Sequence, residues 1–269
     1  MSKQLEPEIA VLFPVYNPGP ELSTSLATLR EQSVPFRLFL VDDGSTIEPD
    51  YAKLTKGMDC QVALLPKNVG IAEALNAGLS IILKGNFKYI ARMDNGDLNA
   101  PTRFEKQIKF LETNPDVTLV GCAVEYHYLS TGLKIMASLP TDASSCARFL
   151  RYNTPLIHPT IMSRIEFFRE VQGYPTDYPA AEDYALEQLA HSLGHKMCNL
   201  PEKLFTAVEH KQSISGGSRR AQLNSRFTLQ RKYFSWSDPH AYFGLARTIA
   251  LMILPINILR KIKKLMVPA

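Results

Sequence analysis

The chain has 269 residues, of which 45% are hydrophobic and 21% are charged, and this composition suits a globular protein with a sizeable core. Its four cysteines lie far apart and have neither the spacing of a zinc site nor that of a disulfide framework, so we expect a reducing cytoplasm. The N-terminus lacks a charged start followed by an apolar run, which argues against a signal peptide or an N-terminal membrane anchor.

The charge is distributed unevenly along the sequence. Residues 216–269 contain ten Lys or Arg residues and one acid, whereas residues 1–215 contain 20 bases and 25 acids. The overall net charge of +4 therefore combines a basic C-terminal segment with an acidic remainder. No RNA- or DNA-binding motif accompanies the basic segment, so nucleic acid is not an expected partner.

The first 125 residues alternate between short β-branched runs and helical patterns, which is typical of βαβ units and a mostly parallel sheet. The first strand is predicted to begin at Ile9 and to end at Pro14. After it, Leu22, Leu26 and Leu29 recur at helical spacing. Further strands are predicted at residues 36–43, 61–65, 88–93 and 117–124, with helices at residues 70–83 and 102–114.

Polar residues follow the predicted strands, at the carboxyl ends where open α/β sheets bind their ligands. There is no G-x-G-x-x-G after the first strand and no G-x-x-x-x-G-K-S/T in the sequence, which argues against dinucleotide and P-loop sites. The polar rim consists of Tyr16, Asn17, Asp42, Asp43, Lys67, Asn68, Asp94 and Asp97.

The second half of the sequence is less regular. We predict a strand at residues 157–163, a helix at residues 182–194 that begins with two acids, and a strand at residues 203–210. The rest is predicted to be helical. Its uncharged run of 12 residues, Thr248–Leu259, is shorter than the roughly 20 residues that span a bilayer, so we expect this basic apolar segment to lie on a membrane surface.

Seven short motifs occur together and in order: FPVYN, VDDGS, KNVGIAEALNAG, ARMDNGD, HPT, AEDYAL and EHKQSIS. Over residues 8–215 their order and spacing resemble those of family 2 glycosyltransferases with the GT-A fold. The resemblance implies an α/β fold with a Rossmann-like mixed sheet, mostly parallel and flanked by helices. It divides residues 1–215 into a nucleotide-binding half at about 8–125 and an acceptor-side half at about 126–215, followed by a helical C-terminal extension at residues 216–269.

The resemblance assigns the nucleotide of the donor to the loops after the first two strands. Pro14, Tyr16 and Asn17 belong to the first loop, in which Tyr16 would stack on the base. In the second loop, Asp42 or Asp43 would accept an N–H of a uracil-like ring. Residue type alone favours a turn with two capping acids at this position, whereas the order of the motifs favours the nucleotide.

The third donor-side loop contains Asn68 and Gly70, which would let the backbone approach the nucleotide. Family members often carry an arginine immediately before the helical asparagine that matches Asn76. This chain has Leu75 there, so any donor contact of that arginine is absent or is made by another residue.

The fourth strand is followed by the run Asp94-Asn95-Gly96-Asp97, where the family commonly has Asp-x-Asp. The resemblance implies that Asp94 contacts the ribose and diphosphate, and that Asp94, Asp97 and His210 bind Mg²⁺ or Mn²⁺, ions that prefer hard oxygen ligands. Because Gly96 replaces the usual second acid, weak metal binding and catalysis without metal are alternatives. Arg92 would then supply positive charge near the diphosphate, or serve as an ion-pair residue.

Asp183 matches the catalytic base of the family and would take the proton of the acceptor hydroxyl. Glu182 would orient the acceptor, and His158 matches a position on the acceptor side. The residues alone also suit structural roles, since acids stabilise a helix N-terminus by about 0.3–1 kcal/mol and a histidine before proline is often structural. Aromatic residues of the C-terminal extension, including Trp236, suit either a core or an acceptor or interfacial belt.

The predicted function is that of an inverting glycosyltransferase. It would move a sugar from a nucleotide diphosphate donor, most simply a UDP-sugar, to a saccharide acceptor, lipid-linked, in the synthesis of a bacterial surface polysaccharide such as O-antigen or capsule. The predicted place is the inner face of the cytoplasmic membrane, with the enzyme bound peripherally. The alternatives are a polyprenyl-phosphate sugar synthase and a non-catalytic subunit that binds nucleotide sugars.

Overall fold

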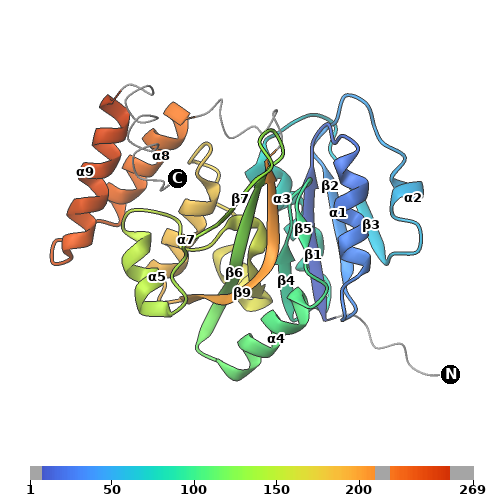
Figure 1. Cartoon of the computed structure of the whole chain (residues 1–269), viewed down its shortest axis with the longest axis horizontal. Coiled ribbons are helices and arrows are strands. Elements are labelled where there is room, and N and C mark those ends of the chain that lie inside the picture. The colour runs from blue at the N-terminus through green and yellow to red at the C-terminus, as the bar shows by residue number, and fades with distance from the viewer. Residues whose placement is uncertain (1–7, 210–218, 255–269) are drawn as a thin grey trace.

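The computed structural model describes residues 8–209 and 219–254. In this part of the chain, nine strands form one sheet in the order β3-β2-β1-β4-β8-β6-β9-β5, with β7 paired to β6 (Figure 1). The strands are β1 Ile9–Val15, β2 Arg37–Asp42, β3 Cys60–Leu64, β4 Tyr89–Arg92, β5 Leu98–Asn99, β6 Val117–Tyr128, β7 Leu133–Met136, β8 Met162–Arg164 and β9 Lys196–Glu209.

The N-terminal part of the sheet is parallel, as the alternating pattern predicted. Strand β1 pairs in parallel with β2 and β4, and β2 pairs in parallel with β3. Strand β8 is antiparallel to both β4 and β6, whereas β6 and β9 are parallel. The sheet is therefore mixed, and the parallel strands direct their carboxyl ends to one edge.

Helices cover both faces of the sheet, and a separate pair lies at the left-hand end of the molecule in Figure 1. That pair is α8 and α9, which come last in the described sequence. The helices are α1 Glu21–Arg30, α2 Tyr51–Leu54, α3 Ile71–Ile82, α4 Arg103–Thr113, α5 Ala143–Leu150, α6 Ile165–Val171, α7 Glu182–Ser192, α8 Arg219–Lys232 and α9 Pro239–Ile253, with a 3-10 turn at His158–Thr160.

Alternate residues of β1 enter two different cores. Ala10 and Leu12 belong to the cluster that contains Leu75 and Leu79 of α3. Ile9, Val11 and Phe13 belong to the cluster that contains Leu22, Leu26 and Leu29 of α1. Burial of each large apolar side chain contributes about 1.5–3 kcal/mol, so both helices are fixed to the sheet mainly by the hydrophobic effect.

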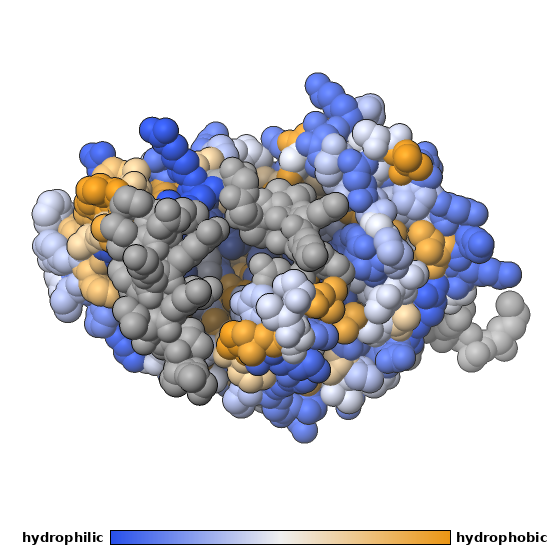
Figure 2. Space-filling model, turned by 45° about the horizontal axis from the view of Figure 1, so that its top comes forward, coloured by the Kyte–Doolittle hydropathy of each residue, from blue (hydrophilic) through white to orange (hydrophobic). Residues whose placement is uncertain are grey.

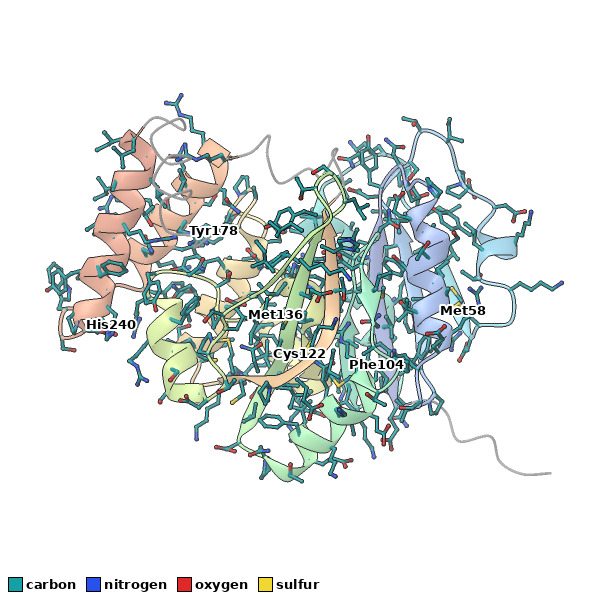
Figure 3. The ribbon with its side chains drawn as sticks, in the orientation of Figure 1. Met58, Phe104, Cys122, Met136, Tyr178 and His240 are labelled. Carbon is teal, nitrogen blue, oxygen red and sulfur yellow. The ribbon has the colours of Figure 1, made fainter. Side chains whose placement is uncertain are left out.

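The second cluster continues into the middle of the sheet. Phe104 of α4 and Cys122 of β6 both belong to it, and Figure 3 shows them in the lower part of the sheet beside α4. Arg103, which is fully buried next to them, donates from Nη2 to the carbonyl oxygen of Arg92 at 2.8 Å. Helix α4 therefore supports the end of β4, where the acidic motif begins.

A glycine allows α3 to approach the sheet closely. A Cβ atom at Gly78 would lie 2.4 Å from Leu12 Cδ1 and 2.8 Å from Val41 Cγ2. These distances are shorter than van der Waals contact, so a larger residue at position 78 would push α3 away from β1 and β2.

Several elements differ from the sequence-based prediction. The predicted strand at residues 157–163 is a 3-10 turn followed by β8, and the strand predicted from residue 203 begins at Lys196. The helix predicted in the C-terminal extension corresponds to α9, and its continuation beyond residue 254 lies outside the described residues. In the described part of the chain, none of the helices is long and apolar enough to cross a membrane.

Candidate active site

The first wall of the site is formed by loops that follow β1, β2 and β3. Gly44 has a φ of +70°, and its backbone packs so closely on Lys67 that a Cβ would lie 2.2 Å from the carbonyl carbon of Lys67. Asn17 donates from its backbone N–H to Ser45 Oγ at 2.8 Å. Through these contacts the three predicted donor loops form one continuous surface.

Asp42 is buried and uses its carboxylate inside the protein. Its Oδ2 accepts from the Tyr51 hydroxyl at 2.5 Å, and its Oδ1 accepts from the Ser45 backbone N–H at 2.8 Å. Burial, followed by the contact with Asp42, raises the pKa of Tyr51, so the phenol remains a neutral donor. These contacts match the capping role that residue type favoured.

Asp43 fixes the third donor loop. Its Oδ1 accepts from the Val69 N–H at 2.8 Å, and its Oδ2 accepts from the Gly70 N–H and from Asn68 Nδ2, both at 3.0 Å. Asp43 therefore determines how the predicted binding residues Asn68 and Gly70 are placed. Tyr16, with 39% of its surface exposed, presents an aromatic ring at the same edge of the sheet.

The acidic motif after β4 is organised by Arg92. This side chain is only 3% exposed, and its Nη1 donates to Asp94 Oδ1 at 2.6 Å and to the Met93 carbonyl oxygen at 2.5 Å. The Asp94 carboxylate forms an ion pair with the buried Arg92. Because 38% of its side chain is exposed, it also remains accessible to a ligand. Arg92 thus supports Asp94 from within the core.

Asp97 points in another direction. It is 8% exposed, and its Oδ1 accepts from the Val208 backbone N–H at 3.1 Å. Burial, and to a lesser degree the charge of Asp94, raise the pKa of Asp97 well above its usual range. Between the two acids, Gly96 has a φ of +95°, a left-handed conformation that an aspartate adopts only with strain.

Two of the three predicted metal ligands lie in the described part of the chain. Asp94 offers an accessible carboxylate, Asp97 is engaged by β9, and His210 lies outside the described residues. Within residues 8–209 and 219–254 there is no group of three or more His, Cys, Asp or Glu side chains suited to hold an ion. The described residues therefore do not form a metal site by themselves.

The candidate base lies in the first turn of α7. Asp183 Oδ1 accepts from the Tyr184 backbone N–H at 2.6 Å, and the Ala181 position before the helix offers no side-chain cap. Burial raises the pKa of Asp183, while the Tyr184 N–H and the charge of Arg226 oppose the rise. The Asp94 carboxylate also contributes to the raised pKa, which places Asp183 within electrostatic range of the acidic motif.

Glu182, beside Asp183 in the first turn of α7, has a pKa close to neutral pH. Burial, and next the charge of Asp183, raise its pKa to about 7, while Arg92 lowers it. One turn further along α7, Glu187 is fully buried, and its Oε1 accepts from the Leu156 N–H at 3.2 Å. Burial and Asp183 raise the pKa of Glu187 well above its usual range. The charge of Asp183 therefore raises the pKa of two further acids of the same helix, Glu182 and Glu187.

His158 lies behind the site rather than on its surface. It is 8% exposed, and its Nε2 is 3.0 Å from the Tyr174 hydroxyl. Burial and the charge of Arg92 lower the pKa of His158 well below its usual range, so the ring is neutral. This environment supports the structural interpretation of the HPT motif, with the positive charge of Arg92 close by.

Two contributors to the site, Tyr174 and Arg226, lie outside the sequence motifs. Asn76 and Tyr174 exchange hydrogen bonds, Tyr174 N–H to Asn76 Oδ1 at 2.7 Å and Asn76 Nδ2 to the Tyr174 carbonyl oxygen at 3.0 Å, and so join α3 to the segment before α7. Arg226 comes from the C-terminal extension. Only the position of Asn76 in the helix after the third donor loop was noticeable in the sequence.

The comparisons with known proteins decide the family. Residues 10–171 match the model of Glycosyl transferase family 2. The chain belongs to this family. It is 33% identical over 202 residues to the amylovoran biosynthesis glycosyltransferase AmsE of Erwinia amylovora, with 73% of this chain and 74% of the relative covered. The chain is therefore a glycosyltransferase, as its motifs predicted.

A second relative comes from Escherichia coli. The UDP-Gal:alpha-D-GlcNAc-diphosphoundecaprenol beta-1,3-galactosyltransferase is 25% identical over 243 residues, which cover 86% of this glycosyltransferase and 87% of the relative. The alignment thus extends over most of both proteins.

Solved structures establish the GT-A fold of this glycosyltransferase. S. aureus TarS 1-349, in complex with UDP-GlcNAc, superimposes with a TM-score of 0.68 at 15% identity, covering 90% of this chain and 71% of the TarS 1-349 chain. The mannosyltransferase PcManGT of Pyrobaculum calidifontis, in complex with GDP-Man and Mn²⁺, gives a TM-score of 0.62 at 19% identity, with 93% and 70% covered. At these identities the likeness shows the fold alone, and it confirms the predicted α/β architecture with helices following the sheet.

Proposed function

We propose that this glycosyltransferase moves a sugar from a UDP-sugar to a lipid-linked saccharide, with inversion at the anomeric carbon, during synthesis of a bacterial surface polysaccharide. The observation that carries the proposal is the position of Asp183, at the start of α7 and within electrostatic range of Asp94, while its neighbour Glu182 is within range of Arg92. Such an arrangement suits a base on one side of the reacting carbon and a charged support for the leaving group on the other.

The chemical step uses residues of this chain. Asp183 takes the proton of the acceptor hydroxyl as the oxygen attacks the anomeric carbon. A new C–O bond forms, the bond from that carbon to the diphosphate breaks, and the nucleoside diphosphate leaves with the electron pair. The α7 N-terminus favours the ionised form of Asp183, which must be deprotonated to act. Glu182, with a pKa near 7, carries a proton for part of the time and orients the acceptor.

The donor is proposed to lie on the wall formed by the first three loops. Tyr16 offers its exposed ring to the base, and Asp43 holds Asn68 and Gly70 where their backbone approaches the nucleotide. Asp94 is proposed to contact the ribose. Pro14 and Asn17 are proposed to belong to this wall, and Asp42 is proposed to act through the turn that it caps.

The choice of donor, acceptor and location draws on the relatives. The name of the E. coli relative gives UDP-Gal as donor and a diphosphoundecaprenol-linked sugar as acceptor, and AmsE is named for amylovoran biosynthesis. A lipid-linked acceptor fits a peripheral enzyme at the inner face of the cytoplasmic membrane, bound through its basic apolar C-terminal segment. Mg²⁺ or Mn²⁺ stays a prediction, because one of its three proposed ligands, His210, lies outside the described residues.

A donor screen tests the proposal. The full-length protein is incubated with UDP-, GDP- and dTDP-sugars and with isolated lipid-linked saccharides, in the presence of Mn²⁺ and, separately, of EDTA. We expect transfer or slow hydrolysis with a UDP-sugar, and the EDTA series reports on the cation. Absence of turnover with every donor, together with UDP binding that Asp183→Ala leaves unchanged, would instead favour the non-catalytic alternative.

A further inference from the structure

Helix α9 is attached to the protein by its small residues. Ala241, Gly244 and Thr248 form its buried side, and the exposed fractions of Ala241 and Thr248 are 5% and 0%. A Cβ at Gly244 would lie 2.0 Å from the carbonyl oxygen of Arg151, so the backbone of α9 rests directly on the end of α5. This side brings little apolar surface to the contact.

The opposite side of α9 is apolar and exposed. A helix on the surface of a globular protein normally buries its large apolar residues and exposes its charged ones, so α9 is inverted. Its one Arg, Arg247, is half-buried and donates from Nη1 to the Tyr152 carbonyl oxygen at 3.2 Å. The exposed large side chains of α9 are Tyr242, Phe243, Ile249, Met252 and Ile253, with exposed fractions of 49%, 57%, 39%, 43% and 74%.

We refer to Tyr242, Phe243, Ile249 and Ile253, together with Trp236, as the outer face of α9, whereas Met252, one turn after the buried Thr248, lies toward the attached side. Trp236, just before the helix, is 81% exposed and stands edge-on to Phe234 at a centroid distance of 5.1 Å. Figure 1 places α9 at the extreme left of the molecule, and Figure 2 shows hydrophobic residues gathered at that same end. The surface is therefore open to a large partner rather than enclosed in a cleft.

The charge around the outer face is positive. Residues 219–254 contain six Lys or Arg and a single acid, Asp238, which is itself paired with Arg151 at 3.0 Å. On α8, Arg220, Arg231 and Lys232 are exposed. In the sequence, residues 255–269 add four more bases and no acid. This balance is complementary to an anionic surface.

We propose that the outer face of α9 docks on an anionic lipid bilayer, with the helix axis parallel to the membrane. The proposal deepens the membrane association that forms part of the proposed function, and it assigns that association to particular side chains. Tyrosine and tryptophan prefer the level of the lipid headgroups, and the apolar residues enter the boundary of the acyl chains. At about 22 Å, the 15-residue helix is too short to cross the bilayer.

The test uses the full-length protein and vesicles of phosphatidylcholine, with and without phosphatidylglycerol, in flotation assays. The wild type should float with the anionic vesicles and much less with the neutral ones. The double variant Phe243→Glu and Ile249→Glu should lose affinity at least about tenfold, because each apolar side chain withdrawn from water contributes as much as a tenfold change in binding. Leu193→Glu, at a 47% exposed apolar position outside the C-terminal helices, is the matched control and should bind as the wild type does.

Two results with vesicles and one without lipid would overturn the proposal. Wild-type protein that ignores anionic vesicles, or a double variant that floats like the wild type, overturns the proposal. So does a wild-type dimer that the double variant dissociates in the absence of lipid, since the occupant would then be a second copy. Hydrolysis of the donor in solution, measured on the same variants, separates the two hypotheses: vesicle binding without turnover contradicts the proposed function alone, and turnover without vesicle binding contradicts the docking alone.

Discussion

The guanidinium carbon of Arg226 lies 4.8 Å from the centre of the Tyr184 ring. Tyr184 follows Asp183 directly, so the C-terminal helices contact the helical turn that carries the candidate base. Arg226 is held in this position by donation from Nη1 to the Tyr152 carbonyl oxygen at 3.2 Å and to Asn153 Oδ1 at 3.1 Å. Tyr178, labelled in Figure 3, accepts from Lys232 of α8 at 3.3 Å and adds a second connection.

The first prediction concerns the charge of Arg226. Burial raises the pKa of Asp183, and the positive charge of Arg226 opposes this rise. The acids that interact with Asp183 are Glu182, Glu187 and Asp94. Removing the positive charge in Arg226→Met should raise that pKa further, so a larger fraction of the base is protonated. We expect kcat/KM on the acidic side of the pH profile to fall roughly two- to tenfold, with less change at high pH.

Two variants make this prediction specific. Arg226→Lys keeps the charge and should keep the position of the acidic limb. Arg231→Met removes a cation from the exposed side of α8, where its guanidinium lies 5.7 Å from the Phe227 ring, and should leave the profile unchanged. An acidic limb that stays in place in Arg226→Met would exclude an electrostatic role for Arg226.

The second prediction concerns stability and Glu182. Because its pKa is raised from 4.5 to about 7, the folded protein holds this proton more tightly than the unfolded chain does. Ionising Glu182 in the folded protein therefore lowers the free energy of unfolding. This loss is absent below about pH 4.5, grows as the pH rises to about 7, and is constant above that. Glu182→Gln should therefore raise the free energy of unfolding on the alkaline side by on the order of 1–3 kcal/mol, and should have little effect in acid.

Urea denaturation across this pH range measures the effect. The matched control is Glu166→Gln, a surface carboxylate on α6, for which we expect the same small change at all pH values. A stability difference for Glu182→Gln that does not depend on pH would mean that the pKa of Glu182 is not raised in the folded state.

The third prediction tests the packing of α3. Alanine at position 78 gains helix propensity of about 1 kcal/mol but places a Cβ 2.4 Å from Leu12 Cδ1 and 2.8 Å from Val41 Cγ2. We expect Gly78→Ala to lower the free energy of unfolding by about 1–3 kcal/mol. Ser80→Ala, at an exposed position of the same helix, should change it by less than roughly 0.5 kcal/mol. If both variants unfold alike, the close approach of α3 is unimportant.

The fourth prediction concerns the turn after β2. Tyr51→Phe removes the hydroxyl that donates to Asp42 Oδ2 at 2.5 Å and leaves a buried carboxylate oxygen without that partner. A hydrogen bond to a charged group contributes about 1.5–3 kcal/mol, and the variant should lose stability on this scale. Donor affinity should fall less than for Tyr16→Ala, since Tyr51 contacts only the loop, whereas Tyr16 is proposed to stack on the nucleotide base. Calorimetric titration with UDP compares the two, and equal losses would contradict the assignment.

The N-terminal half of the fold was predictable because its pattern is local. Strands such as β1 and β2 are buried on both faces and read as continuous apolar runs, and α1 follows with leucines at helical spacing. The motif after β4 also indicated that Asp94 lies at the carboxyl edge of the sheet, and its role there stays a prediction. The parallel order of the strands brings their carboxyl ends together whatever the details of the loops.

Strand β9 shows why the second half was harder to predict. Pro201 and Glu202 interrupt its apolar pattern, and the pairing jumps from Leu200 opposite Cys122 to Lys203 opposite Ala123. A bulge accommodates the two extra residues, including a proline that a regular strand would exclude. Such an irregularity depends on the neighbouring strand β6. From its own sequence, β9 was therefore predicted to begin at residue 203 and not at Lys196.

The supporting contacts of the site are also non-local. Asn76 bonds to Tyr174 across 98 positions, and Arg226 reaches Tyr184 from a helix that carries no motif of the family. Conversely, Asp42 and Asp43 were assigned to the nucleotide from their motif, yet their oxygens accept hydrogen bonds within the protein. Motif order identifies which residues gather at an edge, but the bonds that each side chain makes depend on the folded loops.

The role of Asp183 is tested most directly by Asp183→Asn, with Glu182→Gln as the matched variant on the same turn. Transfer is measured with the donor that the screen identifies, and donor affinity is measured separately by calorimetry. We predict that Asp183→Asn lowers kcat by about 10²–10⁴ while donor affinity stays unchanged, and that Glu182→Gln retains most of the rate. An Asp183→Asn variant that transfers sugar at the wild-type rate would contradict the account.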